Sequence, residues 1–187
     1  MRKRIFLHYL GFGILAILQI AFVFAIILEH IQNPFVIILK LVILASLFFA
    51  YSCILRQKDE KVYDGTLVTI SVLLGAILTY FVNHDLELGP VIGAGSIGVI
   101  ASFIPSIFPK SKQVEVVPPA VYAGAFVGMS GGHVLDNMAL VALAGFFAGL
   151  IYVMTQRSFS GFGGKLGTIA FGGVVLATIL VTLLFGA

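Results

Sequence analysis

The residues able to do chemistry gather in short polar connections of a sequence that is otherwise apolar. Three histidines and four carboxylates lie there: Glu29, His30, His84, Asp85, Glu87, His133 and Asp136. Imidazole and carboxylate groups bind zinc or manganese, so a divalent-metal site is one interpretation. The spacings match no zinc motif, because His84 and Asp85 are adjacent and His133 lies three residues before Asp136. We therefore predict no metal site and no cofactor, and expect an acidic outer mouth formed by His30, His84, Asp85 and Glu87.

The stretch VYAGAFVGMSGGHVLDN, at residues 121–137, is the best place to look for catalysis. Ser130, His133 and Asp136 are three residues apart and would share one face of a continuous helix. Such spacing arises in any helix, and the sequence contains neither GxSxG nor HExxH. The pattern favours a non-enzymatic function without deciding the point, and we predict no catalytic residue.

The same stretch suggests a break in a helix at residues 129–132. Irregular backbone at membrane depth is tolerated where it lines a cavity and frees carbonyl or N–H groups for a ligand. Pro105 predicts a second interruption in the preceding apolar segment. The expected residues of a solute pathway or binding site are Ser96, Gly98, Ser102, Gly128, Ser130, Gly131, Gly132, His133 and Asp136. The alternative is that small residues spaced by four, such as Gly124 and Gly128, only permit close helix packing.

Lys40 is the one basic residue well inside an apolar segment. A charge buried in a bilayer is costly and marks a functional candidate, and Asp136 or Glu29 would be its partner. The alternative is that its long side chain reaches the outer interface. The apolar segments contain no acidic residue, which disfavours ion-coupled pumping, because a coupling ion is usually held by a carboxylate or histidine near mid-membrane.

Membrane-spanning helices must position these residues. Of the 187 residues, 60% are hydrophobic and 10% are charged, whereas a soluble domain carries roughly 25% charged residues. A helix needs about 20 apolar residues to cross a bilayer, and lipid excludes open sheet edges. We predict an all-α, polytopic membrane protein with a single transmembrane domain, in which spans four to seven are glycine-rich. Its seven spans are expected at residues 5–28, 34–55, 65–82, 89–108, 118–135, 138–155 and 167–186.

The basic residues indicate how these spans are oriented. With the N-terminus in the cytoplasm, all 11 Lys and Arg residues except Lys40 fall on the cytoplasmic side, as the positive-inside rule requires. The C-terminus is then outside. A re-entrant hairpin at residues 118–135 would move Arg157 and Lys165 outside, so the distribution favours a true crossing there. The basic residues are scattered and form no patch for a nucleic acid.

We therefore predict an inner (plasma) membrane protein that forms a channel-like or transporter-like passage, or a binding cavity, for a small solute or ion. A chain of this length leaves little room to enclose a pathway alone, so we expect a homo-oligomer or a partner membrane subunit within the lipid bilayer. The alternative is a non-transporting subunit, a scaffold or sensor, that docks another membrane protein through its small-residue helix face. The identity of the solute and the direction of transport do not follow from the sequence.

Overall fold

The computed structural model describes residues 63–156 and 164–186, with scattered positions between residues 10 and 45. This part of the chain is helical and contains no strand. The spans expected at 5–28 and 34–55 lie outside the two continuous ranges, and His30 and Lys40 are not among the described residues.

The later expected spans correspond to helices, with shifted ends. They are α3 (Gly65–Tyr80) with its π-helical continuation η1 (Phe81–Asp85), α4 (Pro90–Ser102), α5 (Ile104–Ile107), the 3-10 turn η2 (Lys112–Val116), α6 (Val117–Gly128), α7 (Met138–Met154) and α8 (Lys165–Phe185). In the described ranges, three helical stretches are long and apolar enough to cross a membrane, at residues 65–85, 90–107 and 165–184. Helix α7 is apolar but shorter. The described helices are therefore compatible with a membrane protein.

Local sequence explains several helix ends. Asp64 precedes α3 and accepts a hydrogen bond from Thr66 N (2.9 Å), and Asn137 precedes α7 and accepts one from Leu140 N (2.8 Å). These side chains satisfy N–H groups that have no partner within the first helical turn. The interruption expected at Pro105 is present, since the helix divides into α4 and α5 two residues before it.

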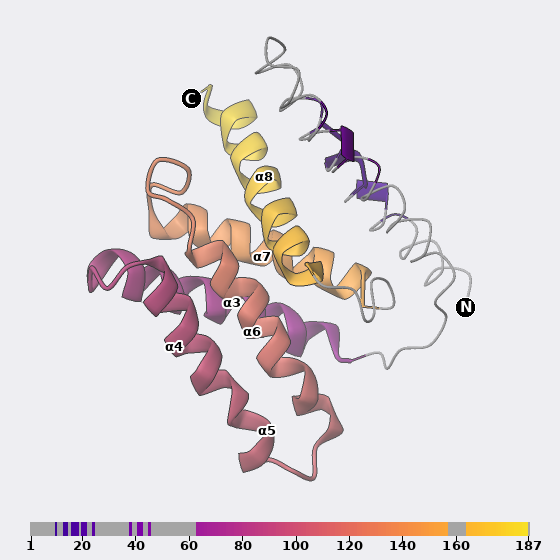
Figure 1. Ribbon diagram of the computed structural model, residues 1–187, viewed down its shortest axis with the longest axis vertical. Coiled ribbons are helices and arrows are strands. Elements are labelled where there is room, and N and C mark those ends of the chain that lie inside the picture. The colour runs from indigo at the N-terminus through magenta and orange to yellow at the C-terminus, as the bar shows by residue number, and fades with distance from the viewer. Residues whose placement is uncertain are drawn as a thin grey trace.

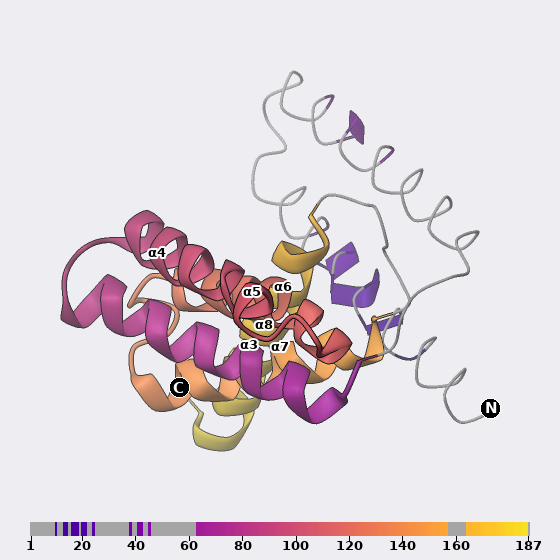
Figure 2. The same cartoon turned by 90° about the horizontal axis from the view of Figure 1, so that it is seen from below.

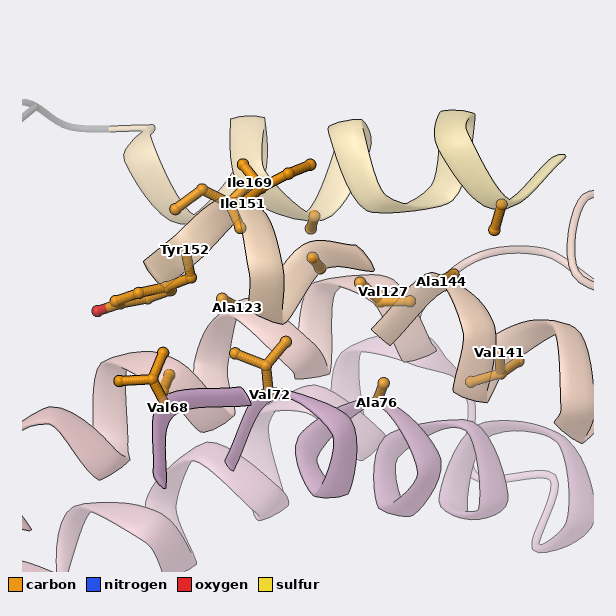
Figure 3. Packing of buried hydrophobic residues seen from close by; sticks show 14 of the residues in the cluster. Val68, Val72, Ala76, Ala123, Val127, Val141, Ala144, Ile151, Tyr152 and Ile169 are labelled. Atoms are coloured by element: carbon orange, nitrogen blue, oxygen red, sulfur yellow. The ribbon is translucent and has the colours of Figure 1, made fainter. Parts of the chain in front are cut away.

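Helix α3 packs against α4, α6 and α7 (Figure 1). Figure 2 shows α4 returning alongside α3 after the turn that contains η1. The buried face of α3, with Val68, Val72 and Ala76, meets valine and alanine side chains of α6 and α7 (Figure 3). Helix α8 packs on α7 and also contacts α6. Because these core side chains are small or β-branched, the helices can approach one another closely.

Glycines bring α3 and α6 into backbone contact. A Cβ on Gly75 would strike the backbone carbonyl of Val121, and a Cβ on Gly124 would strike that of Val72. Neither position has room for a methyl group. The small residues of this helix pair therefore serve close packing, which is the alternative that the glycine spacing raised.

Among the described residues, hydrogen bonds between elements gather at the two ends of α3. At the N-terminal end, the Gln156 side chain bonds both backbone groups of Tyr63 (2.8 and 3.4 Å), and Gln113 accepts from the next amide along the chain (3.0 Å). At the C-terminal end, Asn83 bonds the carbonyl of Gly128 (3.3 Å). The connections between successive helices thus belong alternately to the two ends of the bundle.

The outward faces of the helices are apolar. Exposed large side chains include Ile70 and Leu74 on α3, Ile100 on α4, Phe146 on α7 and Leu183 on α8. Soluble proteins rarely expose apolar surface so continuously. These faces are therefore suited to contact with lipid.

Candidate binding site at the end of helix α6

Helix α6 stops short of the expected span. It contains 12 residues and ends at Gly128. At 1.5 Å per residue this length is about 18 Å, whereas the hydrocarbon core of a bilayer is about 30 Å thick. Residues 129–137 form turns in place of the helix expected to continue to residue 135. Gly131 and Gly132 favour this change, because glycine weakens a helix by up to about 1 kcal/mol relative to alanine.

Two side chains from η1 approach the carbonyl groups at the end of α6. Asn83 Nδ2 donates to Gly128 O (3.3 Å), and His84 Nε2 lies 3.4 Å from Ser130 O. The His84 ring also stacks on Tyr80, with 4.3 Å between the ring centroids. The last carbonyls of a helix have no partner within that helix. The η1 turn therefore supplies polar groups that the interrupted helix needs.

Thr79 lies one turn before Asn83 and is fully buried, at 0% exposure. Its hydroxyl has no hydrogen-bond partner within the described residues, whereas Thr69 and Thr178 donate to the carbonyl one turn earlier in their own helices. A Cβ on Gly128 would lie 2.8 Å from the Thr79 Cβ, so Thr79 packs against the end of α6. A buried hydroxyl without a partner is uncommon and costs about 1–3 kcal/mol, unless a water, an ion or a ligand satisfies it.

The connection after α6 folds back against η1. Gly131 O accepts from both Val134 N (2.8 Å) and Leu135 N (3.1 Å), and the Leu135 side chain is buried in the core. A Cβ on Gly132 would lie 3.3 Å from Cε1 of His84. The buried leucine and the tight turn together hold this connection beside the His84 ring.

Five residues expected from the sequence meet at this site: Gly128, Ser130, Gly131, Gly132 and His84. His133 and Asp136 lie on the same connection but are exposed, and Asp136 accepts a hydrogen bond from the Asn137 side chain (2.7 Å). Because residues 129–137 are not helical, Ser130, His133 and Asp136 do not share the helix face that a continuous helix would have produced.

The other described residues of the expected outer mouth follow His84 in the sequence. Asp85 ends η1 and Glu87 follows it, and both are exposed. Neither residues 81–89 nor residues 129–137 contain Lys or Arg, so this end of the bundle is acidic. Within the described ranges, no group of three or more His, Cys, Asp or Glu side chains could hold a metal ion.

The expected residues on α4 make other contacts. Ser96 Oγ donates to Gly93 O (3.0 Å), and Ser102 donates to a carbonyl three residues earlier (2.7 Å), so both hydroxyls bond within their own helix. A Cβ on Gly98 would strike the ring of Tyr122 on α6. Gly98 therefore provides space for an aromatic ring between two helices.

Sequence patterns do not single out Thr79 and Asn83 as site residues. The available signal is two polar residues, four apart, at the end of an apolar segment, and an ordinary helix end produces the same signal. Their importance depends on the contact with α6, which is distant in the sequence.

A shallow groove lies at the other end of α3. Its volume is about 450 Å³, and it runs between α3 and α7, lined by Asp64, Gly65, Thr66, Thr69, Ile70, Phe146, Leu150 and Val153. Since Asp64 and Asn83 stand at opposite ends of α3, this groove is separate from the site at the end of α6.

Comparison with known proteins identifies no relative. No family model matches the chain, and no curated protein or solved structure matches it.

Proposed function

We propose that this chain is a seven-span protein of the inner (plasma) membrane, with a cytoplasmic N-terminus and an external C-terminus. The support is the agreement between the two polar ends of the bundle and the positive-inside rule. Lys110 and Lys112 precede Gln113, which bonds the N-terminal end of α3, and Lys165 donates to Gln156 O (3.2 Å) at that same end. The opposite end, with η1 and residues 129–137, has no Lys or Arg. The site at the end of α6 then faces outward.

The function that the geometry supports best is binding of a small polar solute or ion at this site, as part of a channel-like or transporter-like passage. The interrupted helix carries the proposal. The carbonyls of Gly128 and Ser130 lie at and just beyond the end of a helix of only 12 residues, and polar side chains from η1 meet them. In membrane proteins, non-helical backbone within the hydrocarbon region is stable where protein surrounds it or where it lines a water-filled cavity.

The close contact of α3 with α6 restricts where a passage can run. Gly75 and Gly124 hold the two backbones together, so a route between these two helices has no support. We therefore place the passage along another face of this pair, where a second copy or a partner subunit would help to enclose it. This placement agrees with the expectation, from the length of the chain, of a homo-oligomer or a complex.

Uptake into reconstituted vesicles tests the proposal. Gly132→Leu places a large side chain beside His84 without entering the contact between α3 and α6. Gly95→Leu on α4 is the matched control, because a Cβ on Gly95 meets nothing within 4 Å. We expect Gly132→Leu to reduce uptake of glycerol, urea, sodium or potassium ions, and Gly95→Leu to leave it unchanged. The proposed site at the end of α6 would be refuted by wild-type vesicles that take up none of these probes. Equal uptake by the wild type and both variants would refute it as well.

A second candidate is a non-transporting membrane subunit, a scaffold or sensor, that docks another membrane protein. Gly95 favours it, because it leaves an uncovered small-residue position on α4 where another helix can approach. This candidate predicts that Gly95→Leu, and not Gly132→Leu, is the variant with an effect. Gly95→Leu would then remove a copurifying membrane partner or a self-association, and Gly132→Leu would not.

A further inference from the structure

The acceptor atoms at the end of α6 define the chemistry of a ligand. Gly128 O keeps one lone pair after accepting from Asn83. The Oδ1 atom of Asn83 accepts no hydrogen bond within the described residues, and the Thr79 hydroxyl has no partner there. These three atoms are neutral oxygens of a carbonyl, an amide and a hydroxyl.

The electrostatic field at this place favours positive charge. The C-terminal end of a helix carries a partial negative charge, equivalent to roughly half an elementary charge, and α6 ends at Gly128. Asp85, Glu87 and Asp136 are exposed on the flanking segments, which contain no Lys or Arg. An anion would be repelled by each of these features.

The oxygen atoms also indicate the type of cation. Calcium and magnesium sites use carboxylate ligands, and zinc-like metals take clusters of imidazole or thiolate groups, which the described residues do not provide. Neutral backbone and side-chain oxygens at interrupted helices are the ligands that bind sodium and potassium ions in membrane proteins.

We propose that the end of α6 binds a monovalent cation, with the Thr79 hydroxyl, Gly128 O and Asn83 Oδ1 as ligands. The inference rests on the proposed function and specifies the ligand class of the same site. It accounts for an otherwise costly feature, a fully buried hydroxyl that does not bond the carbonyl one turn earlier as Thr69 does. A cation would coordinate the lone pairs of that hydroxyl oxygen.

Thermal unfolding of the purified full-length protein tests this ligand class. Unfolding is compared in choline, sodium and potassium chloride at constant ionic strength, so that general screening is the same in all three salts. We expect the wild-type midpoint to rise with sodium or potassium and to saturate, because a ligand that binds only the folded state stabilises it. Thr79→Val should weaken the apparent cation affinity about tenfold or more, as loss of a contact to a charged group does. Thr79→Ser keeps the hydroxyl and should keep the response.

Two further variants complete the comparison. Thr69→Val is the matched control on α3, because its hydroxyl bonds Gly65 O (2.9 Å), and it should respond to cations as the wild type does. Thr79→Ala removes the hydroxyl without the branched side chain, for use if Thr79→Val does not fold. In choline chloride alone, Thr79→Val should unfold at a higher temperature than the wild type, since it removes a buried hydroxyl without a partner.

Two results would overturn the inference: a wild-type midpoint that is equal in all three salts, or an equal cation response in Thr79→Val and the wild type. The uptake experiment separates this failure from failure of the proposed function. If Gly132→Leu blocks uptake of glycerol or urea while no variant responds to cations, the outer site stands and its ligand is a neutral solute. If neither response occurs, both proposals fail.

Discussion

Gly124 of α6 lies directly against the backbone carbonyl of Val72 in α3, and Gly75 of α3 lies in the same way against the carbonyl of Val121 in α6. The two contacts are reciprocal, so each helix offers a glycine to the backbone of the other. Such close approach increases van der Waals contact between backbones, which is a main source of helix association in lipid. It also sets the distance between η1 and the end of α6, whose polar atoms form the candidate site.

Gly124→Ala should destabilise the protein strongly. The added methyl group would overlap the Val72 carbonyl, and overpacking of this kind costs about 1–3 kcal/mol. Gly95→Ala on α4 is the control, because its Cβ has open space, and it should leave the stability unchanged or raise it by about 0.4–1 kcal/mol. Thermal or denaturant unfolding in detergent micelles measures both. Equal stability of Gly124→Ala and the wild type would show that α3 and α6 are not in backbone contact.

Gln156→Ala should loosen the opposite end of the bundle. The Gln156 side chain is 5% exposed and makes two hydrogen bonds to the backbone of Tyr63. Loss of these partly buried bonds should cost about 1–3 kcal/mol and should speed hydrogen exchange at the Tyr63 amide. Gln113→Ala removes one bond at an exposed position (3.0 Å) and should cost less. Unchanged exchange at Tyr63 in Gln156→Ala would contradict this description of the contacts at the N-terminal end of α3.

The apolar pattern of the sequence predicts the later helices well, because a long run of apolar residues is sufficient evidence for a helix in lipid. It places the end of α6 poorly, since Val134 and Leu135 continue the apolar pattern although the helix stops at Gly128. Leu135 is apolar because it fills the core from a turn, and hydropathy does not distinguish this role from membership of a helix.

The glycine pattern predicts close helix contacts but not their partners. Gly124 and Gly128 have the expected spacing, whereas Gly75 has no glycine four residues away and still makes the reciprocal contact. The missing hydrogen bond of Thr79 is beyond sequence reasoning for the same reason. Whether a hydroxyl bonds its own helix depends on the local rotamer and on neighbouring helices, here α4 at Gly93 and α6 at Gly128.

Asn137→Ala should weaken the start of α7. The Asn137 side chain accepts from Leu140 N (2.8 Å) as the N-cap of this helix, and replacing such a cap by alanine costs about 0.5–2 kcal/mol. Asn137→Asp keeps an acceptor oxygen and should retain most of the stability. The unfolding midpoints of the two variants, each compared with that of the wild type, measure the contribution of the cap. If both variants lose the same amount, the cap does not contribute through this hydrogen bond.

Cysteine labelling should place the two polar ends of the bundle on opposite sides of the membrane. Cys53 is the only cysteine of the chain, so Cys53→Ser provides a background for Asp136→Cys and Lys112→Cys, both at exposed positions. On the proposed topology, a membrane-impermeant maleimide labels Asp136→Cys from outside intact cells. It labels Lys112→Cys only after the membrane is permeabilised, because basic connections are retained in the cytoplasm.

The labelling pattern also separates the alternatives for residues 118–135. If both cysteines react from the same side, α6 enters and leaves by one face of the membrane as a re-entrant segment, and the candidate site lies inside the bilayer or at the inner surface. If the two sides are exchanged, the helices cross as proposed but the site faces the cytoplasm. Only external labelling of Asp136→Cys together with internal labelling of Lys112→Cys agrees with a cation site open to the outside, since α6 must then carry the chain across within its 12 residues and the turns that follow.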